Sequence, residues 1–353
     1  MDINLVIIGF GNMGEYHYNR IQEFNKYGKY SLNIVGIYDI DENRNHYAQK
    51  LGLNVYKHFE DILEDDSVNA VLISTPNDKH VYYTLEAAKA KKHIICEKPI
   101  ALNLTEAKKM YRVASKNGVI LAVHQNRRWD DDFLTVKKIY DEKLYGDVNT
   151  IECNICASNG IPGGWRKFNK HGGGMMLDWG VHLIDRLLLL SDAKVEYIYC
   201  EYSHLLGFEV DDGFRLNMKL SNGLNLRCNV DTNCFKKVPR WQVYAYNGTA
   251  QILDWQLNGS VTVVKERIDK ELKAMQAGNG LTKTMADRSP KTIEEVPLEI
   301  VHAEPFAFYN NFCASVNNES EIVIKKEEVF RVIKVMSLAA KSAKTHKTIK
   351  TNL

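Results

Sequence analysis

Short apolar runs alternate with longer amphipathic stretches along the first third of the chain. The runs are rich in Val, Ile and Leu without intervening polar positions, which is typical of parallel strands buried on both faces. The stretches between them have helical character. We predict strands at Leu5–Gly9, Asn33–Tyr38, Ala70–Ser74, His93–Cys96 and Val119–Val123, and helices at Met13–Asn25, Asp41–Leu51, Lys79–Lys91 and Thr105–Lys116. This alternation predicts an α/β fold with a doubly wound parallel sheet and right-handed crossovers.

The pattern changes after about Trp129. From Lys194 onward, strand-like runs are separated by Asn-Gly pairs, and such a pair is the strongest short signal for a β-hairpin. The pairs are Asn222-Gly223, Asn247-Gly248 and Asn258-Gly259. Successive hairpins predict an α+β domain built on an open, mainly antiparallel sheet.

Helices and one long strand accompany this second sheet. We predict a strand near Val148–Ala157, helices at Asp130–Leu144, Ala303–Val316 and Lys326–Lys344, and a helix plus a long loop in the polar stretch 265–297. A chain of 353 residues is long enough for two domains with separate cores. We place the domains at residues 1–125 and 126–353, and the final helix could pack back on the first domain.

Composition excludes several classes of partner. Lys plus Arg (46) nearly balances Asp plus Glu (44), so no strong overall field points to nucleic acid or to an acidic membrane surface. No apolar run approaches the roughly 20 residues needed to cross a bilayer, and residues 1–10 indicate a buried strand rather than a signal peptide. Seven cysteines without framework spacing favour reduced thiols and a cytoplasmic location. Cys153 and Cys156 form a CxxC without a second pair, so we predict no metal site.

A glycine-rich turn follows the first predicted strand. It reads Gly9-Phe10-Gly11-Asn12-Met13-Gly14 and leads into a helix. The first glycine permits the tight turn, the second lets the backbone approach a pyrophosphate, and the third lets helix and strand pack closely. Asp39 follows the next strand, where a carboxylate can accept from a ribose 2′-hydroxyl and would repel a 2′-phosphate. The turn predicts a dinucleotide site that favours NAD over NADP. The alternative is a nucleotide fold that binds nothing.

Polar residues follow two further predicted strands. Thr75, Pro76, Asn77 and His80 follow one strand, and Glu97-Lys98-Pro99 follows the next. Ligands of a doubly wound sheet bind beyond the carboxyl ends of its strands, so we expect these residues to line the cofactor crevice. Lys98 could hydrogen-bond a substrate hydroxyl or relay its proton. The alternatives are ordinary turn chemistry for the first group and a surface lysine before a turn proline for the second.

Asp178 and His182 lie four residues apart, just after three successive glycines at 172–174. On a helix this spacing puts both side chains on one face, with Cβ atoms roughly 5–6 Å apart. A carboxylate within reach of an imidazole can fix its tautomer and hold a proton acceptor near neutral pH. Gly180 lies between them and would let a ring or another strand approach closely. The alternative is a hydrogen bond on a helix surface.

Taken in order, these motifs resemble the glucose–fructose oxidoreductase/inositol dehydrogenase (Gfo/Idh/MocA) family. The resemblance is carried by the glycine turn, the Thr-Pro-Asn strand end, Glu97-Lys98-Pro99, Asn126-Arg127-Arg128 and the segment from Gly172 to Asp185. It covers most of the chain. It is strong up to about Leu190, and after that it rests mostly on the general pattern of strands and turns. It implies a Rossmann domain followed by a domain with an open, mainly antiparallel sheet.

The same resemblance implies roles for individual residues. It implies catalytic roles for Lys98, Asp178 and His182, cofactor contacts from Asn126, Trp165 and Arg166, and substrate contacts that include Arg127 and Trp165. It also implies assembly into a homodimer or homotetramer.

These residues predict an NAD-dependent dehydrogenase that acts on a secondary hydroxyl of a sugar, glycoside or cyclitol. His182, oriented by Asp178, would take the hydroxyl proton while Lys98 holds the oxygen. Two alternatives stay open. One is an enzyme that retains NAD and uses transient oxidation to assist glycoside cleavage, as the resemblance suggests for some members. The other is a cofactor-binding regulator without catalysis.

Overall fold

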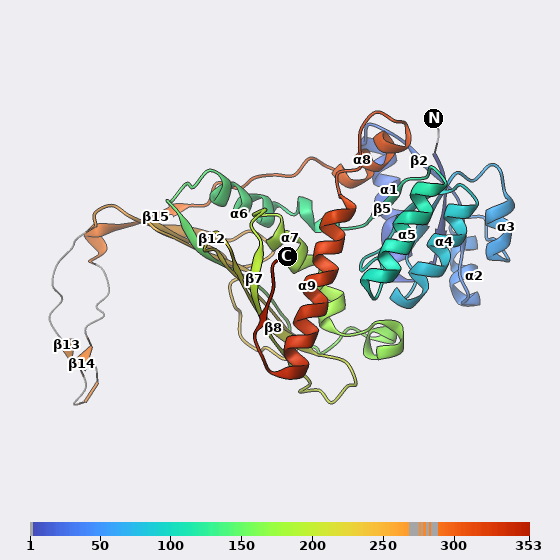
Figure 1. Cartoon of the computed structure of the whole chain (residues 1–353). Helices are drawn as coiled ribbons and strands as arrows, with labels where there is room; N and C mark the ends of the chain where they lie inside the picture. The colour runs from blue at the N-terminus through green and yellow to red at the C-terminus, as the bar shows by residue number, and fades with distance from the viewer. Residues whose placement is uncertain (1–2, 268–274, 277, 280–281, 284–288) are drawn as a thin grey trace.

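A five-stranded parallel sheet forms the centre of the N-terminal part of the protein (Figure 1). The structure is a computed structural model and describes residues 3–267, 275–276, 278–279, 282–283 and 289–353. Its strands are β1 (Ile3–Ile8), β2 (Leu32–Tyr38), β3 (Ala70–Ile73), β4 (His93–Cys96) and β5 (Leu121–Val123). They lie in the order β2-β1-β3-β4-β5, so the direction of winding reverses between β1 and β3. A doubly wound sheet binds its ligands at such a switch point.

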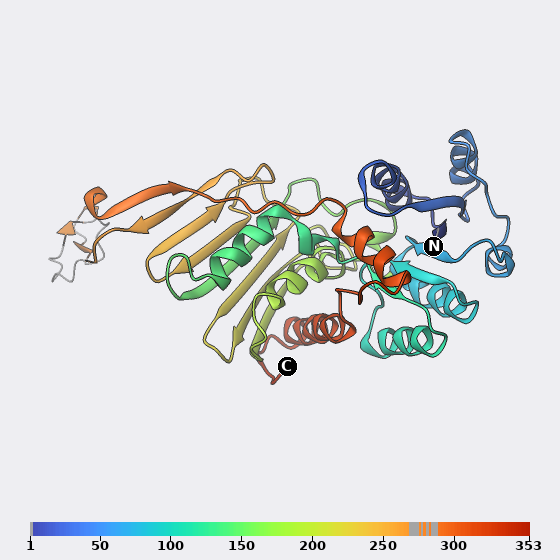
Figure 2. The same cartoon turned by 90° about the horizontal axis from the view of Figure 1, so that it is seen from above.

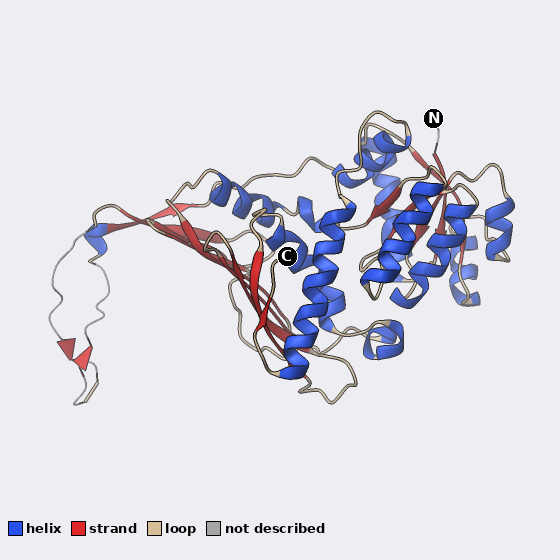
Figure 3. Ribbon diagram, in the orientation of Figure 1, coloured by secondary structure: helices blue, strands red, loops and turns tan. Residues whose placement is uncertain are grey.

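Helices flank this sheet (Figure 3), as the sequence predicts. They are α1 (Asn12–Tyr27), α2 (Glu42–Lys50), α3 (Phe59–Glu64), α4 (His80–Lys89) and α5 (Leu104–Lys116). The short helix α3 was not predicted. The Asn103 side chain caps α5 by accepting from the backbone N–H of Glu106 at 3.0 Å.

The second part contains a nine-stranded sheet in the order β15-β12-β11-β10-β6-β9-β8-β7-β16. The strands are β6 (Val148–Cys156), β7 (Val195–Ser203), β8 (Gly213–Leu220), β9 (Asn225–Asp231), β10 (Trp241–Ala245), β11 (Gly248–Ile252), β12 (Gly259–Val264), β15 (Ile293–Pro297) and β16 (Ile349–Lys350). Only β6 and β9 pair in parallel among these described strands. All three predicted Asn-Gly hairpins are present, between β8 and β9, β10 and β11, and β11 and β12.

Three helices cover one face of this sheet (Figures 1 and 2): α6 (Asp131–Asp141), α7 (Val181–Leu188) and α9 (Lys326–Thr345). The opposite face carries polar side chains that pair across strands, such as Arg227 with Glu152. This face therefore lacks the broad apolar surface that would by itself require a cover. Assembly through it stays a prediction that rests on the family resemblance.

The last two helices connect the two cores. Helix α8 (Ala307–Val316) places Phe308 and Phe312 in the core of the N-terminal sheet. Helix α9 contributes Ile333 to that core and Val335 to the core of the second sheet. Its N-terminal half also contacts α5, where the Phe330 ring meets Tyr111 edge to face at 5.4 Å. No described helix is long and apolar enough to span a bilayer.

In the described residues of the stretch 265–297, the structure differs from the predicted helix and long loop. The helix expected there falls partly on residues outside the described ones. Residues Ile293–Pro297 form the strand β15, which pairs with β12 at an edge of the sheet. Since most of its side chains face solvent, β15 lacks the apolar alternation that would have marked it as a strand.

Candidate active site

The glycine turn joins β1 to α1 in a form that fits a dinucleotide. Gly9 has φ +88°, a left-handed conformation that side chains rarely adopt. A Cβ at Gly14 would lie 2.2 Å from the Gly9 carbonyl oxygen, so the third glycine lets the helix start directly against the strand. A Cβ at Gly11 would meet nothing within 4 Å, which leaves open space at the N-terminus of α1 for phosphates. Asn12 and Met13 form the first turn of this helix.

Asp39 lies beside this turn. Its carboxylate accepts from the backbone N–H of Phe10 at 2.5 Å and from that of Asp41 at 2.9 Å. Arg44 also reaches the turn, where its guanidinium donates to Asn12 at 3.2 Å and lies 3.7 Å from Glu15. Asp39 and Arg44 thus bring a carboxylate and a cation to the same region.

Three other residues predicted to contact the cofactor have structural contacts of their own. The Phe10 side chain is fully buried beside Tyr18, so only its backbone could face a cofactor. His80 is also fully buried, and its ring nitrogens lie 2.9 Å from the Pro99 carbonyl oxygen and 3.0 Å from that of Thr75. Asn77 donates to the Gly172 carbonyl at 2.8 Å. His80 and Asn77 therefore fix the strand-end loops and link them to the second domain.

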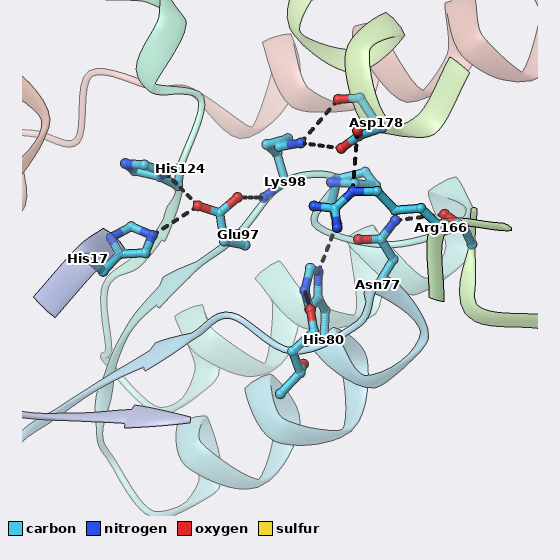
Figure 4. A network of polar contacts seen from close by, with 11 residues as sticks. His17, Asn77, His80, Glu97, Lys98, His124, Arg166 and Asp178 are labelled. Carbon is cyan, nitrogen blue, oxygen red and sulfur yellow. Dashed lines mark hydrogen bonds and ion pairs between the residues drawn. The ribbon is translucent and has the colours of Figure 1, made fainter. Parts of the chain in front are cut away.

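Lys98 and Asp178 form the centre of the site (Figure 4). Lys98 follows β4, and its ammonium lies 3.1 Å from both the carboxylate and the backbone oxygen of Asp178. The Arg166 guanidinium lies 3.3 Å from the other carboxylate oxygen. Burial opposes ionisation of Asp178, but the charges of Lys98 and Arg166 outweigh it and hold its pKa below the usual value. The structure thus joins three predicted site residues from separate segments.

His182 lies next to this group in a helix that differs from the predicted one. Residues Met176–Gly180 form a π-helical turn, and α7 begins only at Val181. The wider turn changes the relative direction of side chains four apart. Among the described residues, His182 Nδ1 has no hydrogen-bond partner, so the expected bond to Asp178 is not present. Burial, followed by the charges of Lys98 and Arg127, lowers the pKa of His182 well below 6.5.

The glycine inside this segment has the predicted role. A Cβ at Gly180 would lie 3.2 Å from the Phe214 ring of β8 and 2.8 Å from Met176 Sδ. The bare backbone therefore lets the segment that carries Asp178 and His182 pack directly on the sheet.

Asp211 holds the start of the same segment. Its carboxylate accepts from the backbone N–H of Met176 at 2.8 Å. A cavity of about 640 Å³ also borders the segment through Met176 and Leu177, but Lys98, Asp178 and His182 do not line it. We therefore place the chemistry in the polar group around Lys98 rather than in this cavity.

Asp211→Asn should change how stability depends on pH. Burial raises the pKa of Asp211 from 3.8 to about 6, whereas an unfolded carboxyl titrates near its ordinary value. Its contribution to stability is therefore present below the unfolded pKa and is lost as the pH rises through the folded pKa. Asparagine keeps an acceptor for Met176 without this titration. We expect the melting temperature of the variant to rise relative to wild type across this range. A difference that is independent of pH would contradict the assignment.

Glu97 lies in a buried group that the sequence did not reveal. His17 Nε2 and His124 Nδ1 lie 2.9 and 2.7 Å from one of its oxygens, and the other oxygen accepts from the backbone N–H of Lys98 at 3.1 Å (Figure 4). Tyr309 of α8 lies 2.8 Å from His17 Nδ1. Burial disfavours the charge of Glu97, but His124 and His17 outweigh it and keep its pKa well below the usual value.

This group also forms a cluster that the sequence analysis did not identify. The ligand atoms of His17, Glu97 and His124 lie within 4.8 Å of one another, a spacing that could hold a metal ion. The sequence indicated no such cluster, because the three residues come from separate elements. The hydrogen bonds of Glu97 tie it to the backbone of Lys98, so its visible role is to position that residue.

The segment Asn126–Trp129 follows β5 and brings further residues to the site. Arg128 is buried in a two-pronged ion pair with Asp185 at 2.6 and 2.8 Å, which is a structural contact within the second domain. Arg127 lies over the Trp179 ring at 4.5 Å and belongs to the site. Arg166 also lies over the ring of its neighbour Trp165, at 4.7 Å.

Comparisons with known proteins cover both parts of the chain. The family described as "Oxidoreductase family, NAD-binding Rossmann fold" matches residues 3–125, and "GFO/IDH/MocA C-terminal domain" matches residues 133–251. The chain is 26% identical over 314 residues to scyllo-inositol 2-dehydrogenase (NADP(+)) of Bacillus subtilis (strain 168), with 84% of this chain and 82% of the relative covered. It is 29% identical over 206 residues to myo-inositol 2-dehydrogenase of Thermotoga maritima, with 58% and 59% covered.

A solved structure is also similar over almost the whole chain. The crystal structure of an NAD-binding protein from Listeria innocua is 36% identical and has a TM-score of 0.90, with 99% of this chain and 97% of that chain covered. The likeness extends over both domains.

Proposed function

Because the chain belongs to the Gfo/Idh/MocA family of oxidoreductases, we propose that it is an NAD-dependent dehydrogenase of sugars, glycosides or cyclitols. The observation that carries the proposal is the meeting of Lys98 and Asp178 beside a buried His182, next to the sheet that carries the glycine turn. The two curated relatives are named as inositol dehydrogenases, which supports a secondary hydroxyl as the reacting group.

Each residue of the site has a distinct task in this reaction. Bound NAD would accept or donate a hydride at its nicotinamide ring. Lys98, held by Asp178, would donate a hydrogen bond to the substrate oxygen, and the neutral imidazole of His182 would take the hydroxyl proton. Asp178 pairs with Lys98 rather than with His182. Its role therefore differs from the one predicted from the spacing of Asp178 and His182.

The pH dependence of the oxidation reaction should report on His182. An imidazole accepts a proton only above its pKa, and the pKa of His182 lies well below 6.5. We therefore expect kcat/KM for oxidation to stay level as the pH falls to 6.5 and to decline only below it. His182→Asn should lower the rate by about 10²–10⁴-fold and remove this decline. A decline centred at or above the ordinary histidine value would contradict the role.

Cofactor preference should depend on Asp39. We propose NAD as the cofactor because the Asp39 carboxylate would repel a 2′-phosphate, although the Bacillus relative is named for NADP(+). Asp39→Asn keeps a hydrogen-bond acceptor but removes the charge. We expect its ratio of kcat/KM for NADP over NAD to rise about tenfold, or about 1.4 kcal/mol. Arg44→Gln is the matched control and should lower that ratio. An unchanged ratio in Asp39→Asn would contradict the assignment.

A substrate screen tests the proposed function. The purified protein is first checked for cofactor that co-purifies and is then incubated with NAD and a panel of sugars, glycosides and inositols. We expect free reduced cofactor to accumulate in step with oxidised product. Glycoside cleavage without net reduction of NAD would instead identify an enzyme that retains its cofactor. NAD binding without any turnover would favour a regulator.

A further inference from the structure

Arginine and tryptophan side chains form a continuous group beside His182. The Trp179 ring lies 6.0 Å from the His182 ring, and Arg127 lies over Trp179 at 4.5 Å. Trp255, on the hairpin between β11 and β12, lies 6.0 Å from Trp179 and 5.2 Å from the Arg127 guanidinium. Arg240, the residue before β10, lies 3.1 Å from the Trp255 ring. These contacts extend from His182, the proposed base, to Trp255, whose side chain is 52% exposed.

Cationic side chains outnumber the carboxylates that they contact in this region. Arg127 pairs with Asp130 at 2.9 Å, Arg186 lies 3.5 Å from Asp130 and 3.3 Å from Asp132, and Arg240 also pairs with Asp132. Three guanidinium groups thus share two carboxylates. At the neighbouring centre, Lys98 and Arg166 share the single carboxylate of Asp178. Across the two groups, five cationic side chains therefore contact three carboxylates.

Buried donors in the same group also lack acceptors. Nε and Nη1 of Arg240 and Nε and Nη2 of Arg186 are buried, and no described residue accepts a hydrogen bond from them. Buried charged donors of this kind are costly to leave unsatisfied. Arg127 differs from these two because its side chain is 26% exposed. It is the member of the group that a ligand can reach.

We propose that the substrate carries an anionic group, a carboxylate or a phosphate, which Arg127 binds directly while Trp179 and Trp255 contact the body of the molecule. Arg186 and Arg240 supply positive potential behind Arg127. A planar guanidinium suits either anion because it can donate two parallel hydrogen bonds. The inference rests on the proposed function, since it takes the reacting carbon to lie between Lys98 and His182. From there, a single sugar ring would bring a substituent toward Arg127.

Ligand binding to the NADH-loaded protein tests the inference without turnover. Calorimetry compares D-glucuronate, D-galacturonate and D-glucose 6-phosphate with the neutral parents D-glucose and D-galactose. We expect at least one acid or phosphate to bind about tenfold more tightly than its parent. We also expect that advantage to shrink as salt is raised. The carboxylate and phosphate arms distinguish a sugar acid from a sugar phosphate. Equal or weaker binding of every anionic ligand would overturn the proposal.

Variants of Arg127 identify the residue responsible. Arg127→Gln should remove most of the preference for the anionic ligand and leave the affinity of the neutral parent within about twofold, whereas Arg127→Lys should keep part of the preference. Arg112→Gln, which removes an exposed arginine on α5, is the control and should bind both ligands as wild type does. An equal loss for both ligands in Arg127→Gln would show that Arg127 only supports Trp179, and would overturn the proposal.

Hydride transfer, measured with the same proteins loaded with NAD in place of NADH, separates this inference from the proposed function. Reduction of NAD by neutral sugars without an anionic preference would contradict the inference alone. Preferential binding of an anion without transfer to NAD from any ligand would contradict the proposed dehydrogenase activity alone.

Discussion

Lys98→Met should lower kcat/KM for substrate oxidation by about 10²–10⁴-fold. The substitution removes the ammonium that lies 3.1 Å from Asp178 and that we assign to the substrate oxygen. The affinity for NAD, measured by fluorescence titration, should change little, because the glycine turn and Asp39 lie elsewhere on the sheet. Steady-state turnover in the NAD-linked assay provides the measurement.

Two further variants separate catalysis from stability. Lys98→Met leaves Asp178 buried with Arg166 as its remaining partner, which should lower the melting temperature. Adding Asp178→Asn removes that carboxylate and should restore the melting temperature but not the turnover. Lys89→Met, at an exposed lysine that pairs with Glu86, is the matched control and should leave both unchanged. Turnover of Lys98→Met within a few-fold of wild type would exclude the assigned role.

Two glycine substitutions should produce different defects at the same turn. In Gly14→Ala the new methyl would lie 2.2 Å from the Gly9 carbonyl oxygen, so the start of α1 must move. We expect a loss of stability of about 1–3 kcal/mol, as for other overpacked sites, together with a large loss of NAD affinity. In Gly11→Ala the new methyl meets nothing within 4 Å. This variant should melt like wild type and bind NAD at least about tenfold more weakly, because the methyl occupies the approach of the pyrophosphate.

The comparison of the two variants provides the control. Thermal unfolding without cofactor tests the packing, and titration with NAD tests the binding. Equal stability losses in both variants would contradict the packing assigned to Gly14. Wild-type affinity in Gly11→Ala would place the pyrophosphate away from this turn.

The features that sequence analysis predicted are those set by local patterns. Apolar runs located the parallel strands, Asn-Gly pairs located the hairpins, and the glycine turn located the switch point of the sheet. Lys98, Asp178 and Arg166 were named from motifs, but their contact depends on how β4 and the π-helical turn meet. On an assumed α-helix, the four-residue spacing of Asp178 and His182 predicted a bond between these two side chains. The wider π-helical turn instead directs Asp178 to Lys98.

The residues that were missed are joined only by tertiary structure. His17 and Glu97 are 80 positions apart and meet because α1 packs beside the end of β4. Arg240 and Asp132 are 108 positions apart, and Trp255 reaches the site from a hairpin tip. Periodicity describes the face of one element and carries no information about which distant element covers it. Neither group could therefore be assembled from the sequence alone.

A crystal structure of the complex with NADH tests the central claim most directly. We predict that the pyrophosphate lies at Gly11 and that the nicotinamide ring lies beneath the space between the Lys98 ammonium and the His182 imidazole. One alcohol carbon should fit between the ring and these two groups. A nicotinamide ring that contacts neither group would contradict the account. So would a ring that contacts only one of the two groups while the other faces a separate cavity.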